Sequence, residues 1–468
     1  MAELRILMTI PSLLEAVQGI CLCNYSPLNG FSSVATDSRN VQSGSMFVPL
    51  IGEYQDGHQY IHKALESGAS VILVDEEHAS GSSSVFSGLA KQYNACVIQV
   101  PKTLRALQDA ARWYVKQFPS LLKIGVTGSS GKTTTKEILG AIFSQKYAVV
   151  MNEGNLNSET GLPLSVFKIR SEHQIGIFEL GMNRRNEISE IARVLSPVYA
   201  LITNIGTAHI GILGTQHAIA EEKKAVFSFF SSDCKGFVPE DDSFAEFLKE
   251  IPAGTVYSFG VQSTPGFEQA EDRGIDGTRI RYEGVDIHFP LPGYYNFKNA
   301  LGAISVAREA GCSPLEIKNG LESVKPLFGR AEIRKGSITV MLDCYNANPD
   351  SMERAIEFCS SVAWKRNKIF VLGSMLELGA ESETAHRSVC AKAAVSGVRS
   401  VLFFGSEIIE AARNTEWGAV KVYFLDTIEE VIATLKEAVS EGDLVLVKGS
   451  RGMALERIMP ALSERFQC

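Results

Sequence analysis

The chain has 468 residues, of which 45% are hydrophobic, and a formal net charge of −8. This length exceeds what one hydrophobic core supports and predicts about three domains. The negative charge, without any run of Lys or Arg, argues against nucleic acid or an anionic membrane surface as the main partner. No stretch reaches the roughly 20 apolar residues of a membrane span, and the N-terminus lacks the basic start and small-residue cleavage site of a signal peptide. The nine cysteines follow no metal-type spacing, which indicates reduced thiols and a cytoplasmic protein.

Residues 1–100 contain short apolar runs and a helical stretch near 60–67, which predicts a small α/β domain ending close to Pro101. Polar side chains cluster in two of its turns, at 37–39 and at 56–58. Loops that carry Arg, Ser and His close together can bind a diphosphate or a sugar, although ordinary solvated turns have a similar composition. The candidate binding residues of this region are Ser38, Arg39, Asp56, Gly57 and His58.

The sequence KIGVTGSSGKTTTKE at residues 123–137 predicts a strand, a phosphate-binding loop and the start of a helix. Gly128 and Gly131 permit backbone conformations in which amide groups surround phosphate oxygens. Lys132 adds a positive charge, and the Thr133 hydroxyl can bind Mg²⁺. The general motif has its first glycine at position 126, where this chain has valine, so a plain glycine-rich turn is the alternative. The predicted nucleotide-binding residues are Thr127, Gly128, Ser129, Ser130, Gly131, Lys132, Thr133 and Thr134.

Strands and helices alternate through residues 101–328, which predicts a mostly parallel sheet with its ligand at the carboxyl ends of the strands. Glu179 ends one apolar run, and a carboxylate at this place beside a phosphate loop is a typical holder of Mg²⁺. His209 follows another run and could bind a second cation or an oxyanion, or could be a hydrogen-bonded histidine without such a role. A third run is followed by Asn155, Asn157 and Ser158.

Residues 256–292 show β-type alternation without intervening helices, and we expect a β excursion within the central domain. Directly after it, Asn296 and Asn299 lie three residues apart at the start of a helix. Their amides could bind the edge of an adenine ring, and plain helix capping is the alternative.

The alternation of strands and helices restarts after Arg330, so residues 329–468 are predicted to form a third, Rossmann-like α/β domain. Three of its strands end in polar loops, at 343–349, 373–379 and 448–451. Since the carboxyl ends of parallel strands share one edge of a sheet, we expect these loops to form one binding face.

Four segments resemble those of the Mur ligase superfamily, and the resemblance covers essentially the whole chain. TGSSGKTTTKE resembles its ATP loop, GNLNSETGLP its substrate loop, ELGMNRRNEI its Mg²⁺ glutamate segment and NIGTAHIGILG its histidine segment. YNANPDSM and VLGSMLELG resemble the branch that adds a D-alanyl-D-alanine dipeptide, and the Asp-Asn-Pro-Arg signature of the diaminopimelate-adding branch is missing from the sequence. The polar turns of residues 1–100 are similar to the UDP-binding domain of both branches.

The resemblance implies an ATP-dependent amide-bond ligase of peptidoglycan precursor synthesis that uses Mg²⁺. ATP would phosphorylate the terminal carboxylate of a UDP-N-acetylmuramoyl-tripeptide, and the amine of D-alanyl-D-alanine would attack the acyl phosphate. No protein nucleophile is needed for this chemistry. We expect a monomer in which residues 1–100 bind the UDP substrate, residues 101–328 bind ATP and residues 329–468 bind the dipeptide.

The resemblance also assigns roles to individual residues. The implied catalytic residues are Lys132, His209, Lys223 and Arg330. The implied metal-binding residues are Thr133, Glu179, His209 and Lys223. Nucleotide contacts outside the loop are implied for Asn296, Asn299, Arg330, Asp343, Tyr345 and Asn346. Substrate contacts are implied for Ser38, Arg39, Asp56, Gly57, His58, Asn155, Asn157, Ser158, Asn348, Glu377 and Lys448.

Lys223 has two possible interpretations. By pattern alone, the adjacent Lys223 and Lys224 indicate the solvated face of a helix. The resemblance aligns Lys223 with a lysine that is carbamylated in these ligases and helps to hold a second Mg²⁺. Because carbamylation requires an uncharged amine, this interpretation predicts a partly buried lysine with a lowered pKa.

The sequence departs from the family pattern at Ser158 and Ser374, where the family has asparagine and aspartate, at Tyr295, where a histidine is common, and at Leu342, where an aspartate often precedes Asp343. Three alternatives remain open. The first is the diaminopimelate- or lysine-adding branch, and the second is folylpolyglutamate synthase, which has no domain like residues 1–100. The third is a P-loop ATPase switch, which would hydrolyse ATP without an amino-acid acceptor.

Overall fold

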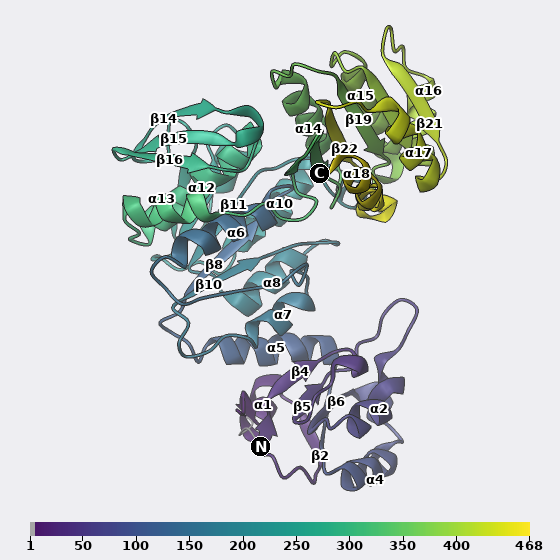
Figure 1. Ribbon diagram of the computed structural model, residues 1–468. Helices are drawn as coiled ribbons and strands as arrows, with labels where there is room; N and C mark the ends of the chain where they lie inside the picture. The colour runs from purple at the N-terminus through teal and green to yellow at the C-terminus, as the bar shows by residue number, and fades with distance from the viewer. Residues whose placement is uncertain (1–4) are drawn as a thin grey trace.

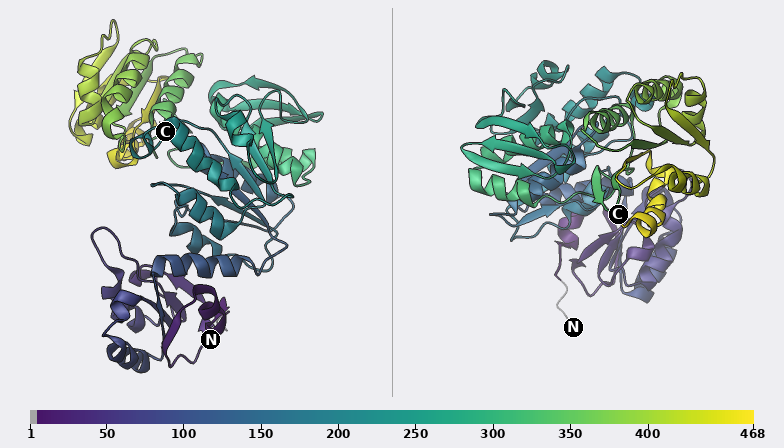
Figure 2. Two further views of the ribbon diagram at one scale, coloured as in Figure 1. Left: turned by 180° about the vertical axis from the view of Figure 1, so that it is seen from behind. Right: turned by 45° about the horizontal axis from the view of Figure 1, so that its top comes forward.

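The computed structural model describes residues 5–468 and consists of three α/β domains that follow one another along the chain (Figure 1). The central domain lies between the N-terminal and C-terminal domains in Figure 1 and in the left view of Figure 2. None of the helices in residues 5–468 combines the length and the apolarity that crossing a bilayer requires. The α/β class with three domains is therefore as the sequence predicts, while the boundaries at 100/101 and 328/329 remain predictions.

The N-terminal domain is built on a five-stranded sheet in which only the edge strand β2 is antiparallel to its neighbour. In sheet order, the strands are β2 (Ile20–Asn24), β7 (Cys96–Val100), β6 (Val71–Asp75), β5 (Ser45–Phe47) and β4 (Ser33–Ala35). Two short strands, β1 (Met8–Thr9) and β3 (Gly30–Phe31), pair separately. The helices are α1 (Ile10–Val17), α2 (Ile61–Glu66), α3 (Glu76–Ala79) and α4 (Ser83–Tyr93).

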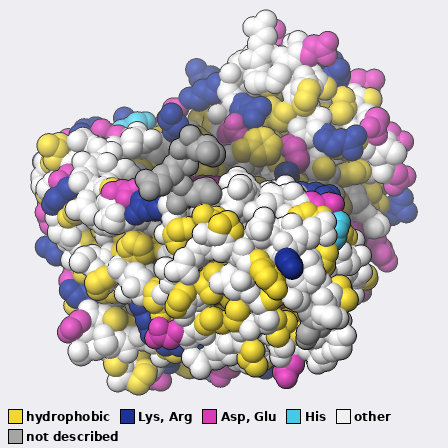
Figure 3. Space-filling view, turned by 90° about the horizontal axis from the view of Figure 1, so that it is seen from below, with side chains coloured by type: hydrophobic (Ala, Val, Ile, Leu, Met, Phe, Trp, Pro, Cys, Tyr) yellow, Lys and Arg dark blue, Asp and Glu magenta, His cyan; other side chains and the backbone are white. Residues whose placement is uncertain are grey.

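The predicted helix near 60–67 is present as α2, but the domain contains more helix than the sequence pattern indicated. The start of α1 carried a recognisable signal, since the Thr9 side chain caps it and Pro11 occupies its first turn. The face of this domain seen in Figure 3 is dominated by apolar and uncharged side chains, with acidic and basic groups mixed around it.

The central domain has a six-stranded sheet in which every strand pair is parallel. In sheet order, the strands are β13 (Thr255–Phe259), β12 (Lys235–Pro239), β11 (Tyr199–Ile202), β8 (Leu122–Thr127), β10 (Ile175–Glu179) and β9 (Val149–Met151). After β8 the chain first builds β9 and β10 on one side and then β11 on the other. The order of strands thus reverses at β8, and the crevice at the carboxyl end of such a strand is where open α/β sheets bind ligands.

Helices cover both faces of the central sheet, and α5 packs against α1 of the N-terminal domain as well as against α7 and α8 (Figure 1). The helices of this part of the chain are α5 (Thr103–Val115), α6 (Lys132–Phe143), α7 (Gly161–Val166), α8 (Glu187–Leu195), α9 (Ile210–Leu213), α10 (Gln216–Lys224), α11 (Ala245–Lys249), α12 (Tyr294–Glu309) and α13 (Pro314–Ser323).

The predicted β excursion is correct in kind, but it starts later than expected. Its first apolar run, β13, joins the central sheet as a parallel edge strand beside β12. The separate antiparallel sheet comprises β14 (Phe267–Asp272), β15 (Thr278–Tyr282) and β16 (Val285–Phe289). An edge strand has one exposed face, so β13 shows the same alternation as the excursion, and the sequence pattern cannot separate the two.

The C-terminal domain has a second six-stranded sheet, which is parallel except at the edge strand β17. In sheet order, the strands are β17 (Glu332–Lys335), β18 (Thr339–Asp343), β22 (Leu444–Lys448), β19 (Lys368–Gly373), β20 (Ser400–Phe404) and β21 (Lys421–Leu425). Its helices are α14 (Pro349–Ser361), α15 (Ser382–Ala394), α16 (Ser406–Arg413), α17 (Ile428–Ala438) and α18 (Met459–Phe466). The three polar loops predicted for one edge follow β18, β19 and β22, which are neighbours in the sheet.

Candidate active site

The phosphate loop connects the end of β8 to the first residue of α6, in the strand–loop–helix arrangement that the sequence predicts. Gly128 has a φ of +148° and Gly131 a φ of +80°, both in the region that favours glycine. A Cβ on Gly128 would lie 1.8 Å from Thr203 Oγ1, and one on Gly131 would lie 2.7 Å from Asn299 Oδ1. Both positions therefore require glycine, for the backbone conformation and for the close approach of neighbouring side chains.

Asn204, two residues after the end of β11, binds the backbone of the phosphate loop at Ser129 and Ser130. Its carbonyl oxygen accepts from Ser129 N at 3.0 Å, and its Oδ1 accepts from Ser130 N at 2.9 Å. The Thr127 hydroxyl donates to Leu180 O at 2.9 Å. The N–H groups at the start of α6 have no partner within the helix and can bind an anion, as is general for a helix N-terminus.

Two cationic side chains lie at the loop. Lys132 folds back over it and donates from Nζ to Gly128 O at 2.8 Å. Burial lowers the pKa of the Lys132 ammonium; the Glu179 carboxylate opposes this shift and the Arg330 guanidinium adds to it. Arg330 stacks on the Tyr345 ring, 4.2 Å from the ring centroid. Two neighbouring positive charges that repel each other are well placed to bind an anion.

Glu179 is buried at the end of β10, between the phosphate loop and the asparagine-containing loop. Its Oε2 accepts from Thr133 Oγ1 at 2.7 Å and its Oε1 from Asn157 Nδ2 at 2.7 Å. Asn152 binds its main chain on both sides, accepting from Glu179 N at 2.9 Å and donating to Glu179 O at 3.1 Å. A fixed carboxylate beside a threonine hydroxyl offers the hard oxygen ligands that Mg²⁺ prefers, so these residues fit the predicted metal.

Lys223 is buried at 1% exposure, so its interpretation as a solvated lysine is wrong. Burial lowers the pKa of its amine well below the ordinary value, and the nearby Lys132 adds to this shift. The neighbouring Glu222 carboxylate accepts from Asn186 N and Ile188 N, at 2.7 and 2.8 Å, at the start of α8. An uncharged amine is the form that carbamylation requires.

His209 is another titratable group, partly buried and close to Lys223, whereas Lys224 points to a different part of the domain. Burial, with the charges of Lys132 and Lys223, lowers the pKa of His209 to about 4, so its ring is neutral at pH 7. A neutral imidazole suits a cation better than an oxyanion. Lys224 instead donates to Phe247 O at 2.6 Å and lies over the Phe247 ring.

The two asparagines at the start of α12 have different environments. The Asn299 side chain lies against Gly131 of the phosphate loop. Asn296 is buried and donates to Pro292 O at 2.8 Å, within its own chain segment. Tyr295 packs into the core of the C-terminal domain, and within residues 5–468 its buried hydroxyl has no hydrogen-bond partner.

Asp343 and Lys448 form a salt bridge at the ends of β18 and β22, with 2.6 Å between Lys448 Nζ and Asp343 Oδ2. Lys448 Nζ also lies 3.4 Å from Asn346 O, and Asn346 Oδ1 accepts from the next amide of the chain. The structure thus turns Lys448 towards the strand ends. Asn348 caps α14, accepting from Ser351 N at 2.9 Å.

The C-terminal domain contacts the segment that follows β11. Asp350 Oδ2 accepts from Thr207 N at 2.7 Å and from Thr207 Oγ1 at 3.1 Å. A Cβ on Gly211 of α9 would lie 3.2 Å from Glu377 O, so the loop after β19 also lies against the central domain. Sequence reasoning missed Asp350, Asn152 and Asn204 as site residues. Asn152 directly follows β9 and Asn204 comes two residues after β11, so both could have been found as strand-end polar residues, whereas Asp350 lies in the first turn of α14.

Asn155 is exposed, and Ser158 accepts from Gly161 N at 3.2 Å at the start of α7. Ser374 is buried and accepts from Ile408 N at 3.3 Å at the start of α16.

The N-terminal candidates lie in a different domain from the phosphate loop (Figure 1). Ser38 is buried, and Arg39 is bound to Asp37 at 2.5 Å. The rings of His58 and His78 stack on each other, and the Asp56 carboxylate bonds to both, at 2.7 Å from His58 Nδ1 and 2.6 Å from His78 Nε2.

The atoms of Asp56, His58 and His78 are close enough to one another to hold a metal ion. However, His58 Nε2 accepts from Asp75 N at 3.1 Å while its Nδ1 faces Asp56, so both ring nitrogens are engaged. Gly57 is required in this turn, because a Cβ there would lie 2.7 Å from Leu50 N. The cluster is therefore a hydrogen-bond network that shapes the turn at 56–58.

The fold and the site together define a multidomain P-loop enzyme that binds a nucleotide. Family models match three parts of the chain: "Mur ligase family, catalytic domain" at residues 31–114, "Mur ligase middle domain" at 126–307 and "Mur ligase, glutamate ligase domain" at 329–451. The chain belongs to the Mur ligase family.

Two curated relatives are named UDP-N-acetylmuramoyl-tripeptide–D-alanyl-D-alanine ligase. The one from Treponema pallidum is 46% identical over 97% of this chain and 99% of its own length, and the one from Bacillus subtilis is 32% identical over 97% and 98%. Among solved structures, MurF from Acinetobacter baumannii has a TM-score of 0.86 at 28% identity, over 98% of this chain and 99% of its own. MurF from Thermotoga maritima in complex with ADP has a TM-score of 0.79 at 26% identity, over 93% and 98%.

Proposed function

We propose that this chain is a Mg²⁺- and ATP-dependent ligase that joins the terminal carboxylate of a UDP-N-acetylmuramoyl-tripeptide to the amine of D-alanyl-D-alanine, in peptidoglycan precursor synthesis. The observation that carries the proposal is the site at which Lys132, Arg330 and the buried Glu179 carboxylate meet at one phosphate loop. It occurs in a chain that matches relatives named UDP-N-acetylmuramoyl-tripeptide–D-alanyl-D-alanine ligase along nearly its whole length.

The chemistry must bring two anions together, the γ-phosphate of ATP and the carboxylate that attacks it. The α6 amides and Lys132 hold the phosphates, and Arg330 offsets the repulsion between the anions. When bound, Mg²⁺ supplies further charge neutralisation, with Thr133 and Glu179 as its proposed ligands and His209 and carbamylated Lys223 as those of a second ion. The carboxylate oxygen attacks the γ-phosphorus, the bond to the bridging oxygen breaks, and ADP leaves an acyl phosphate behind. The uncharged amine of the dipeptide then attacks the acyl carbon, so that an amide bond forms, inorganic phosphate leaves and the amine gives up a proton to solvent.

The proposal divides the work between the domains. Residues 1–100 bind the UDP substrate, 101–328 bind ATP and 329–468 bind the dipeptide. The support is the arrangement of polar loops at the strand ends of the second and third domains, which are in contact through Asp350 and Thr207. A monomeric, cytoplasmic protein stays a prediction from the sequence.

The test is to incubate the purified protein with ATP, Mg²⁺, UDP-N-acetylmuramoyl-tripeptide and D-alanyl-D-alanine, following phosphate release and product mass. We expect one phosphate per ligated product and no turnover when either acceptor or donor is omitted. Phosphate release without the amine would favour an ATPase switch. Ligation of diaminopimelate or lysine to a UDP-linked dipeptide, or of glutamate to a folate, would favour the other ligases.

A further inference from the structure

Helix α14 of the C-terminal domain is docked directly onto the loops that surround the phosphate site. Asp350, in its first turn, binds the amide and the hydroxyl of Thr207 at 2.7 and 3.1 Å. A Cβ on Gly206 would lie 2.2 Å from Asp350 Oδ2, so this approach depends on glycine at that position. Gly206 N in turn donates to Ser129 Oγ of the phosphate loop at 2.9 Å. The segment Gly206–Thr207 therefore connects the start of α14 to the phosphate loop, with Thr207 bound to Asp350 and Gly206 bound to Ser129.

Arg354 lies one helical turn after Asp350, on the same face of α14. Its Nη1 donates to the Ser130 hydroxyl in the middle of the phosphate loop, at 3.4 Å. Within residues 5–468, this is the one hydrogen bond that its side chain makes, and no carboxylate oxygen lies within 4.0 Å of the guanidinium. The C-terminal domain thus places a permanently charged group without a counter-ion at the phosphate loop.

A guanidinium without a counter-ion at a phosphate loop favours the binding of an anion there. Five N–H donors and a permanent positive charge make arginine suited to phosphate oxygens, and an arginine supplied by a second domain is a recurring device in phosphoryl transfer. The weak contact with the neutral Ser130 hydroxyl leaves most of these donors for a ligand.

We propose that Arg354 binds a phosphate oxygen of the nucleotide held at the loop, as a second arginine of the C-terminal domain beside Arg330. This inference rests on the proposed function for the presence of ATP. It adds a residue that the sequence motifs did not indicate, and it means that nucleotide phosphates and the Asp350–Thr207 contact hold the two domains together.

The test compares the full-length wild type with Arg354→Gln, Arg354→Lys and the control Arg387→Gln. Arg387 is an exposed residue of α15 that pairs with Glu383, far along the chain from the loop. Binding of ATP and of adenosine is measured by calorimetry with Mg²⁺ present, together with the KM for ATP and for the dipeptide. Thermal unfolding checks that each variant is folded. If Arg354→Gln does not fold, the comparison of ATP and adenosine binding is made with Arg354→Lys.

We expect Arg354→Gln to weaken ATP binding by about ten- to hundredfold, the loss typical of a hydrogen bond to a charged group. Adenosine binding and the KM for the dipeptide should be unchanged, and Arg354→Lys should restore part of the loss. The inference about Arg354 would be overturned if the variant bound ATP within twofold of wild type, or if its binding of ATP and of adenosine were weakened equally. In either case, ligation by the wild type would still support the proposed function. Failure of the wild type to bind ATP would overturn both.

Discussion

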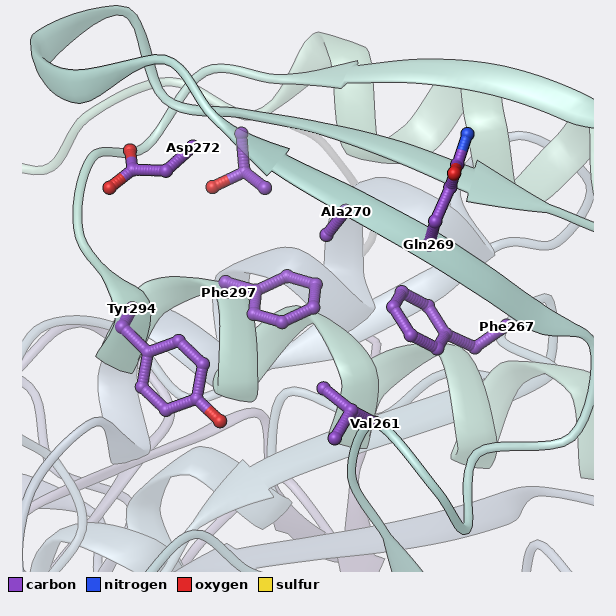
Figure 4. Close-up of a pocket in the computed structure, with 8 residues that line it drawn as sticks. Val261, Phe267, Gln269, Ala270, Asp272, Tyr294 and Phe297 are labelled. Carbon is purple, nitrogen blue, oxygen red and sulfur yellow. The ribbon is translucent and has the colours of Figure 1, made fainter.

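Thr133 Oγ1 lies 2.7 Å from Glu179 Oε2, which joins the first turn of α6 to the end of β10. Thr133 lies in the helix that follows β8, and Glu179 ends β10, the neighbour of β8 in the sheet. Each side chain offers an oxygen atom, the ligand that Mg²⁺ prefers. This contact places the proposed metal beside the N–H groups that would bind phosphate. A cavity of about 360 Å³ lies between the antiparallel sheet and the start of α12, where Phe267, Tyr294 and Phe297 line it (Figure 4). None of the residues assigned to the phosphate or metal site is part of its lining.

Glu179→Gln tests the metal assignment. The substitution keeps the shape but removes the charge and replaces one of the two acceptor oxygens by an amide NH₂. We therefore expect a strongly raised Mg²⁺ requirement or loss of turnover. The measurement is ligation rate against Mg²⁺ concentration. The matched control is Glu77→Gln, which removes an exposed carboxylate in the N-terminal domain. An Mg²⁺ titration identical to that of wild type would rule out Glu179 as a ligand.

Lys132→Ala should abolish ligation and leave the fold intact, because water cannot replace a cation at the phosphates. The rate is measured with saturating substrates, and circular dichroism checks the fold. Lys91→Ala, at an exposed position of α4, is the control. More than a tenth of the wild-type rate, a limit of about 1.4 kcal/mol in barrier height, would argue against the assigned role.

Lys223→Ala should cripple activity, and added short carboxylates should partly restore it, because they can supply the oxygen ligand of a carbamate. Lys224→Ala should leave the rate nearly unchanged and cost about 1 kcal/mol of stability through the lost bond to Phe247 O. Rates are measured with and without bicarbonate. Equal effects of the two substitutions on activity, or full activity of Lys223→Ala in bicarbonate-free buffer, would contradict carbamylation.

His209 should stay neutral down to acidic pH. Its pKa in the folded protein is lowered from 6.5 to about 4, so the unfolded chain binds the proton more readily between these values. Stability should therefore fall as the pH drops from 6.5 towards 4. The free energy of unfolding is measured in urea without added Mg²⁺ for wild type and for His209→Asn. The wild-type value minus the variant's value should decrease from pH 7 to pH 5, because only the wild type has this histidine. A difference that is constant or grows would contradict the lowered pKa.

Arg39→Ala tests the division of labour between domains. Arg39 is exposed in the N-terminal domain and bound to Asp37. If it contacts the UDP substrate, its removal should raise the KM for that substrate several-fold and leave the KM for ATP and for the dipeptide unchanged. A change confined to the KM for the dipeptide would show that the assignment of residues 1–100 is wrong.

The sequence by itself determined the features whose cause is local. The phosphate loop was predictable because its mechanism requires a strand, two glycines and a helix start within one short segment, and Glu179 was predictable because it ends an apolar strand beside that loop. The alternation of strands and helices likewise predicted the α/β class and three domains. The resemblance to the Mur ligases rests on such contiguous segments as well.

Only the tertiary structure decided what depends on packing between distant segments. Two adjacent lysines look alike in sequence, but the packing of α10 buries Lys223 and leaves Lys224 bound to Phe247 O. The salt bridge that turns Lys448 towards Asp343 joins strands more than a hundred residues apart. The approach of α14 to the phosphate loop depends on how two domains dock, which no local pattern encodes because the contacts form only once both domains have folded.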